Sequence, residues 1–139
     1  MNLKLRGTDM TSGSKRRKGP KLASLKSLKR KLDQAFSRYI RERDALPNGM
    51  GYCFTCNHYR TLEASHFVPR QHLATRWDER NVHGACAYCN RWLHGNLAEF
   101  YLRLVTTYGQ PIVDELMALK RITVKYTRSE LEDLIKRYS

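Results

Sequence analysis

Apolar side chains recur every three or four residues along the stretch that follows Pro20. This spacing places them on one face of an α-helix, and the neighbouring lysine and arginine residues fall mostly on its other sides. We expect this helix to pack on a core and to end before the breaker sequence Pro47-Asn48-Gly49. The apolar positions are Leu22, Leu25, Leu28, Leu32, Phe36 and Ile40.

The middle of the chain is short-segmented and rich in loops. Residues 50–85 leave room for a β-hairpin near 59–69 and for another short strand near 80–84. We expect Trp77 and Trp92 to lie in the core. After Cys89, helical spacing returns and continues to a stop at Gly109; its apolar positions are Leu93, Leu97, Phe100, Tyr101, Leu104 and Val105.

The C-terminal part carries two helix-start signals. Pro111 suits the first turn of a short helix that runs through Leu119. Thr127 and Glu130 form a capping-box pattern before the apolar residues of a last helix. Short strands combined with these helices predict an α+β fold.

Positive charge is concentrated at the N-terminus. The net charge is +13, and residues 1–31 hold eleven basic residues against one acid, Asp9. Residues 1–20 lack apolar periodicity, so we expect a flexible basic arm there and a single domain over residues 21–139. Such an arm attracts polyanions, which makes DNA the expected partner; its basic run is Lys15, Arg16, Arg17 and Lys18.

Apolar runs in the chain stay short of the roughly 20 residues that span a bilayer, and no apolar stretch follows Lys4 and Arg6 to make a signal peptide. We therefore expect an intracellular protein without a membrane partner. In that setting, four cysteines indicate a metal site more often than disulfides.

The cysteines form two Cys-x-x-Cys pairs separated by 29 residues. Two intervening residues allow both thiolates of a pair to turn toward one point, and two such knuckles complete the tetrahedral shell of a structural zinc. A saturated shell leaves no position for water, so we expect this zinc to hold the fold rather than to catalyse. The predicted ligands are Cys53, Cys56, Cys86 and Cys89.

Between and after the knuckles stand residues suited to hydrolysing a phosphodiester. His66 can accept a proton from water near neutral pH, and Asn81 can orient its ring. Asn90 offers a hard oxygen to Mg²⁺ or Mn²⁺. His94, at i+4 from Asn90, is expected on the same helical face, as a second metal ligand or as the acid for the leaving oxygen.

This order of His, Asn and Asn resembles the HNH (ββα-metal) nuclease motif. Many HNH enzymes place an acidic metal ligand directly before the base, where this chain has Ser65. We hypothesise that Glu63, which shares the strand face of Ser65, replaces that ligand directly or through water. Flanking arginines are expected to bind phosphates; they are Arg60, Arg70, Arg76 and Arg91.

A longer series of segments, spread over roughly residues 33–119, adds to the motif. In order, they are Tyr39-Ile40-Arg41-Glu42-Arg43-Asp44, Cys53 to Cys56, Ser65-His66, Asp78-Glu79-Arg80-Asn81-Val82-His83, Cys86 to Cys89, His94-Gly95-Asn96-Leu97, Tyr108-Gly109-Gln110 and Val113-Asp114-Glu115. Together they resemble the NinG (Rap) family of lambdoid-phage recombination nucleases. The resemblance implies a structure-specific, divalent-metal endonuclease acting on branched intermediates, namely Holliday junctions and D-loops. Symmetric cleavage of a junction needs two active sites, so the resemblance also implies a homodimer. A phage-encoded protein of this family would act in the host cytoplasm.

The resulting expectation is a treble-clef ββα-metal zinc core with an N-terminal helix and C-terminal helices. Two alternatives remain: a non-catalytic zinc-finger protein that binds nucleic acid, and an HNH nuclease that acts on linear duplex DNA. Each site residue also has a structural alternative. His66 would be a hydrogen-bonded structural residue, Asn81 a turn residue, Asn90 a helix cap, and His94 and the arginines solvated surface groups.

Overall fold

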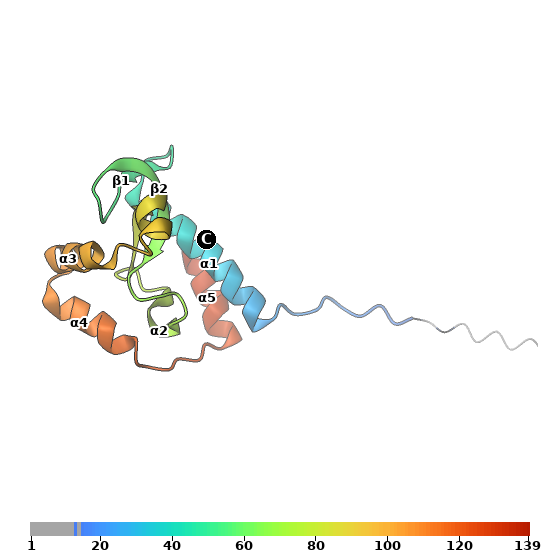
Figure 1. The fold of residues 1–139 in the computed structure, drawn as a ribbon. Helices are drawn as coiled ribbons and strands as arrows, with labels where there is room; N and C mark the ends of the chain where they lie inside the picture. Colours follow the sequence, from blue (N-terminus) through green and yellow to red (C-terminus); the bar gives the residue numbers. More distant parts are fainter. Residues whose placement is uncertain (1–12, 14) are drawn as a thin grey trace, which may run out of the picture.

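The computed structural model describes residue 13 and residues 15–139 (Figure 1). A three-stranded antiparallel sheet in the order β1-β2-β3 lies between helices, which confirms the predicted α+β class. The elements are α1 (Leu25–Asp44), β1 (Met50–Tyr52), β2 (Tyr59–His66), α2 (Leu73–Arg76), β3 (Val82–Cys86), the single π-turn η1 (Tyr88–Trp92), α3 (Leu97–Tyr108), α4 (Gln110–Leu119) and α5 (Arg128–Tyr138).

The predicted N-terminal helix is confirmed as α1, but it begins later than the apolar pattern indicates. Ser24 caps it, with its hydroxyl accepting from the N–H of Ser27 at 3.1 Å. Leu22 therefore falls outside the helix and is 78% exposed, and Leu25 in the first turn is exposed as well. Residues 15–23 form no helix or strand, and the basic run Lys15 to Lys18 is exposed; residues 1–12 and 14 of the expected arm lie outside the described part.

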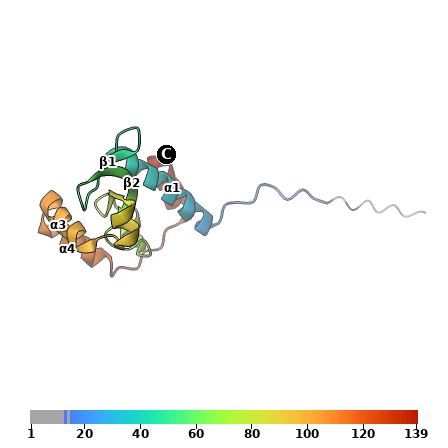
Figure 2. The ribbon, with the colours of Figure 1, turned by 45° about the horizontal axis from the view of Figure 1, so that its top comes forward.

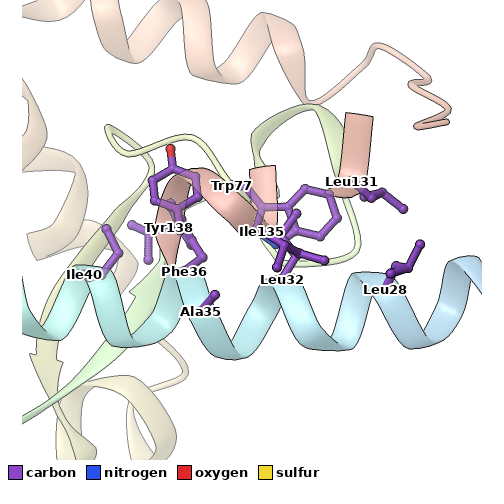
Figure 3. Close-up of a cluster of buried hydrophobic side chains, with 10 residues drawn as sticks. Leu28, Leu32, Ala35, Phe36, Ile40, Trp77, Leu131, Ile135 and Tyr138 are labelled. Atoms are coloured by element: carbon purple, nitrogen blue, oxygen red, sulfur yellow. The ribbon is translucent and has the colours of Figure 1, made fainter. Parts of the chain in front are cut away.

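The main core lies between α1 and α5, although the two helices stand at opposite ends of the chain (Figure 3). Leu32, Phe36 and Ile40 of α1 are fully or almost fully buried there. Trp77 closes the core from the loop after α2 and is 7% exposed, which confirms its predicted burial. Burying large aliphatic and aromatic side chains of this kind contributes roughly 2 kcal/mol each.

Sequence signals for the C-terminal helices are also confirmed. Gly109 ends α3 with a φ of 90°, in the region that favours glycine. α4 follows at once, with Pro111 in its first turn. Thr127 and Glu130 form the predicted capping box of α5, each side chain accepting from the backbone N–H of the other.

Two predicted elements differ in the structure. Residues 59–66 form one strand rather than a hairpin, and that strand pairs with β1 on one side and β3 on the other. The helix expected to run on from Cys89 is broken in two, because residues 94–96 interrupt it: His94 and Asn96 have φ values of 51° and 48°, outside the right-handed helical region. Trp92 ends η1 and is 77% exposed, so its predicted burial is wrong.

The two faces of β2 look toward different parts of the molecule. Leu62, Ala64 and His66 alternate onto the side that faces α1, where Ala64 packs against the α1 core. Glu63 and Ser65 occupy the opposite side. Figure 2 shows β2 next to α1 from a second direction. Among the described residues, no helix is long and apolar enough to cross a membrane.

Candidate metal centre and catalytic site

The four predicted zinc ligands come together from separate elements. Cys53 and Cys56 follow β1, Cys86 ends β3, and Cys89 lies in η1. Their sulfur atoms all lie within 4.8 Å of one another, and the Sγ atoms of Cys56 and Cys86 are 3.8 Å apart. Four sulfurs bound at about 2.3 Å to one zinc stand about 3.8 Å from each other, so the cluster has the dimensions and donor chemistry of a tetrahedral zinc site.

Local hydrogen bonds prepare this cluster for a cation. Cys53 Sγ accepts from the N–H of Cys86 at 3.3 Å and lies 3.3 Å from the Thr55 hydroxyl. Burial opposes ionisation of Cys53, but such donors favour the thiolate and lower its pKa to about 6. Burial and the neighbouring thiols raise the pKa of Cys56 to about 12. Four neighbouring thiolates would therefore repel one another strongly in the absence of a metal. A divalent cation would balance these charges and favour ionisation of all four thiols.

His66 lies at the C-terminal end of β2, and one of its ring nitrogens forms a hydrogen bond to the backbone. Its Nε2 stands 2.9 Å from the backbone carbonyl of Arg76. A carbonyl only accepts, so Nε2 carries the proton and, in the neutral ring, Nδ1 carries a lone pair. Burial lowers the pKa of His66 and keeps the ring neutral near pH 7. The ring lines a cavity of about 130 Å³ between α1 and β2.

Asn81 is fully buried and organises the loop between β2 and β3. Its Oδ1 accepts from the N–H of Val68 at 2.7 Å. Its Nδ2 donates to the carbonyls of Val68 at 3.0 Å and Thr75 at 3.1 Å. The predicted hydrogen bond from Asn81 to the His66 ring is therefore replaced: Asn81 holds the loop, and the loop supplies the Arg76 carbonyl that orients the ring.

Asp33 of α1 holds the middle of that loop. Its carboxylate accepts from Arg76 through Nε at 2.9 Å and through Nη2, and from Trp77 Nε1 at 3.0 Å. The Arg76 side chain is only 16% exposed. We therefore revise Arg76 from a predicted phosphate contact to a structural residue, because its guanidinium forms a largely buried ion pair with Asp33.

Glu63 and Asn90 lie together on the other side of β2. Asn90 Nδ2 donates to Glu63 Oε1 at 3.0 Å, and Arg91 forms a two-point ion pair with the same carboxylate. Burial alone would raise the pKa of Glu63, but these donors outweigh it and lower the pKa. Ser65, on the same face, holds the one buried side-chain oxygen of the described residues that lacks a hydrogen-bond partner. A carboxylate, an amide and a hydroxyl oxygen are donors suited to Mg²⁺ or Mn²⁺.

The prediction for His94 is wrong in its geometry. η1 closes with an i to i+5 bond, from the Leu93 N–H to the Tyr88 carbonyl at 3.0 Å, and ends at Trp92. His94 follows in a left-handed turn and is exposed, so it does not share a helical face with Asn90. Its neighbour Gly95 lies against the end of β2, since a Cβ there would stand 3.9 Å from the His66 carbonyl oxygen.

The proposed base and the predicted metal ligands thus approach β2 from two sides. The Leu62 N–H donates to Gly49 of the β1 segment, whereas the Phe67 N–H donates to Asn81 before β3. By alternation, the backbone of His66 points to the edge where β1 has ended, and the turn at Gly95 lies at that edge. His66 and Glu63 therefore flank one open strand edge from opposite faces, rather than lining one common cleft as the motif predicts.

The other three predicted phosphate-binding arginines differ in how freely their side chains could contact a phosphate. Arg60 is exposed on β2, and the Arg70 side chain is 64% exposed, 4.0 Å from Asp33. Arg91 is exposed but paired with Glu63.

Three residues have positioning roles that the sequence analysis did not predict. Asp33 looked like an ordinary solvated charge on a basic helix. The adjacent pair Arg43 and Asp44 docks the end of α1 onto β3: Arg43 Nη2 donates to the Val82 carbonyl at 2.8 Å, and Asp44 Oδ2 accepts from the Gly84 N–H at 2.7 Å. Only the fold brings these residues to partners about forty positions away.

The chain matches the model of the family described as Bacteriophage Lambda NinG protein over residues 4–139. It is 36% identical over 94 residues to Protein ninG of Escherichia phage 933W, covering 60% of this chain and 41% of that protein. To Protein ninG of Escherichia phage lambda and of Salmonella phage P22 it is 35% identical over 94 residues, covering 60% of this chain and 40% of each. The matched region thus spans about two fifths of these relatives, and no solved structure matches the chain. Because the family model covers nearly all of its length, the chain belongs to the NinG family of bacteriophage proteins.

Proposed function

We propose that this chain is a metal-dependent DNA endonuclease that hydrolyses phosphodiesters in branched recombination intermediates, Holliday junctions and D-loops among them. The observation that carries the proposal is the state of His66. Its Nε2 is fixed by the Arg76 carbonyl, burial keeps the ring neutral, and the ring borders a cavity that Arg70 also lines. A positioned neutral imidazole beside a cation is suited to activating water against a phosphate. The preference for branched DNA rests on the family resemblance.

In the proposed reaction, His66 Nδ1 takes a proton from water as the water oxygen forms a bond to phosphorus. The bond from phosphorus to the ester oxygen breaks, and that oxygen takes a proton from solvent. Asn90 and Glu63 would hold Mg²⁺ or Mn²⁺, which supplies positive charge for the phosphate. The Arg76 carbonyl keeps Nε2 protonated throughout, so that Nδ1 remains the basic nitrogen.

Zinc is proposed to act as scaffold in a treble-clef, HNH-like core. Its four thiolates join the segment after β1, the end of β3 and η1. η1 carries Asn90, so zinc binding would fix the residue that faces Glu63.

The experiment compares wild-type protein with His66→Ala and His66→Gln on a labelled four-way junction and on linear duplex of the same sequence, with and without Mg²⁺. We expect wild type to cut the junction only with the divalent cation, and each variant to lose at least about a hundredfold in rate, as removal of a general base does. His58→Gln, at an exposed histidine, is the matched control. Equal cleavage of duplex would favour a nuclease for linear DNA, and binding without cleavage by wild type would leave only a zinc-finger binding module.

Glu63 has its own test. Glu63→Gln keeps the side-chain shape but removes the charge, so we expect weaker Mn²⁺ binding by isothermal titration and slower cleavage that excess Mn²⁺ partly restores. Unchanged metal affinity together with unchanged cleavage would exclude Glu63 as a ligand.

A further inference from the structure

A groove runs between α1 and β2 and passes His66. Three adjoining hollows form it, of about 590, 130 and 370 Å³. Arg41 lines both the first and the third hollow, and Ser37 and Arg70 line both the second and the third. These shared lining residues place the hollows next to one another along α1, with the His66 ring in the second.

Arginine side chains line each of the three hollows. Arg30, Arg38 and Arg41 of α1 are exposed, and no ion pair of the described residues involves them. Two acids line the groove. Asp33 is bound by Arg76, and Glu42 stands at the far end. The groove therefore presents a net positive wall, distinct from the apolar stripe that α1 buries against α5.

We propose that this groove carries the sugar-phosphate backbone of one nucleic-acid strand past His66, with Arg30, Arg38 and Arg41 as its phosphate contacts. The inference rests on the proposed nuclease function and deepens it by assigning the substrate a path. Arg30 and Arg41 are eleven residues apart on one helix, which places them about 16 Å apart along its axis. Duplex DNA rises about 3.4 Å per nucleotide along a strand, so the groove spans about five nucleotide steps.

Several features favour a nucleic-acid strand over an acidic peptide. The cations follow a line, as phosphates do, and Arg30 lies toward the start of α1, which the exposed basic run Lys15 to Lys18 precedes. Peptide grooves hold their ligands by apolar anchors in pockets. Here the hollow beside Arg30 is lined by polar and charged side chains only.

The test measures binding of the zinc-loaded chain of residues 1–139 to a fluorescent four-way junction without Mg²⁺, so that cleavage does not intervene. The variants are Arg41→Gln and the double variant Arg38→Gln/Arg41→Gln. The control is Arg103→Gln, at an exposed arginine of α3 without an ion-pair partner in the described part of the chain. Zinc content and circular dichroism verify that each variant is folded.

Each phosphate contact contributes about 0.9 to the slope of log affinity against log salt, which amounts to about eightfold in affinity at about 0.1 M salt. We expect Arg41→Gln to weaken binding by about that factor, the double variant by on the order of 50-fold with a slope shallower by about 2, and the control by less than about twofold. A poly-glutamate peptide is expected to compete far less well than DNA of equal charge.

Wild-type affinity and slope in the double variant would overturn the groove assignment, even if wild type cleaves DNA. Poly-glutamate that competes as well as DNA would overturn it too, by making the groove a general anion site. If the arginine variants lose binding as expected but wild type cleaves no substrate, the groove assignment stands and the nuclease proposal fails.

Discussion

Replacing Asn81 by alanine tests whether that residue acts on the fold or on the chemistry. The side chain is fully buried and makes three hydrogen bonds of 2.7 to 3.1 Å to the backbone of Val68 and Thr75, residues that are themselves buried. Alanine would remove all three bonds and leave the N–H and the carbonyl of Val68 without partners, whereas the Thr75 carbonyl keeps the bond from the Asp78 N–H at 3.1 Å. At about 1 kcal/mol for each neutral bond, plus the cavity left by the amide, we expect the free energy of unfolding to fall by about 3 to 5 kcal/mol.

The assay is urea unfolding in excess zinc, followed by tryptophan fluorescence. Trp77 is the buried tryptophan and belongs to this loop, whereas Trp92 is already exposed in the folded protein. Asn48→Ala is the matched control, because its Oδ1 caps the Met50 N–H at an exposed turn, and we expect it to cost about 0.5 kcal/mol. Asn81→Asp keeps the acceptor for Val68 but loses both donors and buries a charge, so it should be no more stable than the alanine variant.

A loss of less than about 1 kcal/mol in Asn81→Ala, combined with a full loss of cleavage, would refute this reasoning. It would mean that the amide acts on the substrate or the His66 ring, as the motif alone suggested. A large loss of stability, with cleavage that recovers at low temperature, would instead fit a residue that acts by holding the Arg76 carbonyl in place.

The remaining predictions concern pH, zinc and the last helix. Burial and the nearby Arg43 lower the pKa of His83 to about 4. As the pH falls, the unfolded chain therefore takes up this proton before the folded chain does. His83 thus contributes about 3 kcal/mol of stability above pH 6.5, and this contribution is lost as the pH falls through 4. Urea unfolding of His83→Gln should therefore differ from wild type at pH 7 and converge with it near pH 4. Chelation of zinc, or Cys89→Ser, should unfold the knuckle region and reduce bound zinc from one equivalent to none, measured by a colorimetric zinc assay. Thr127→Ala should cost about 1 kcal/mol by losing the capping bond to Glu130, with Ser129→Ala as control.

Short-range patterns in the sequence were sufficient for α1, for the boundaries of the C-terminal helices and for the pairs of the cysteine cluster. The stripe of α1, the stop at Gly109 and the capping box of α5 each depend on residues within a few positions of each other, and the structure contains all three. Likewise, each Cys-x-x-Cys pair constrains its own geometry. The fold then brings the two pairs close enough to bind one ion.

The catalytic geometry was less predictable because it depends on long-range contacts. The partners of His66 and Asn81 are backbone groups of the loop between β2 and β3, and backbone groups leave no trace in the choice of residue types. The i+4 argument for His94 assumed a regular helix, but the left-handed turn at His94 ends it. Arg76 resembled its exposed neighbours in sequence, and only the contact with Asp33 separates it from them.

The two sides of β2 are held in place by different physical means, and this division bears on how the site works. On the α1 side, the His66 loop is fixed by Asn81, by the Asp33–Arg76 pair and by the large apolar core that contains Trp77. On the other side, η1 has little packing of its own, since Trp92 is exposed and the cluster around the knuckles is mostly the cysteines themselves. We therefore expect the position of Asn90 opposite Glu63 to depend on the proposed zinc ligation, and the orientation of the His66 ring to be independent of it. The proposed metal ligands and the proposed base can then shift relative to each other across the open edge of β2, and a strand lying in the groove beside α1 would meet the base first.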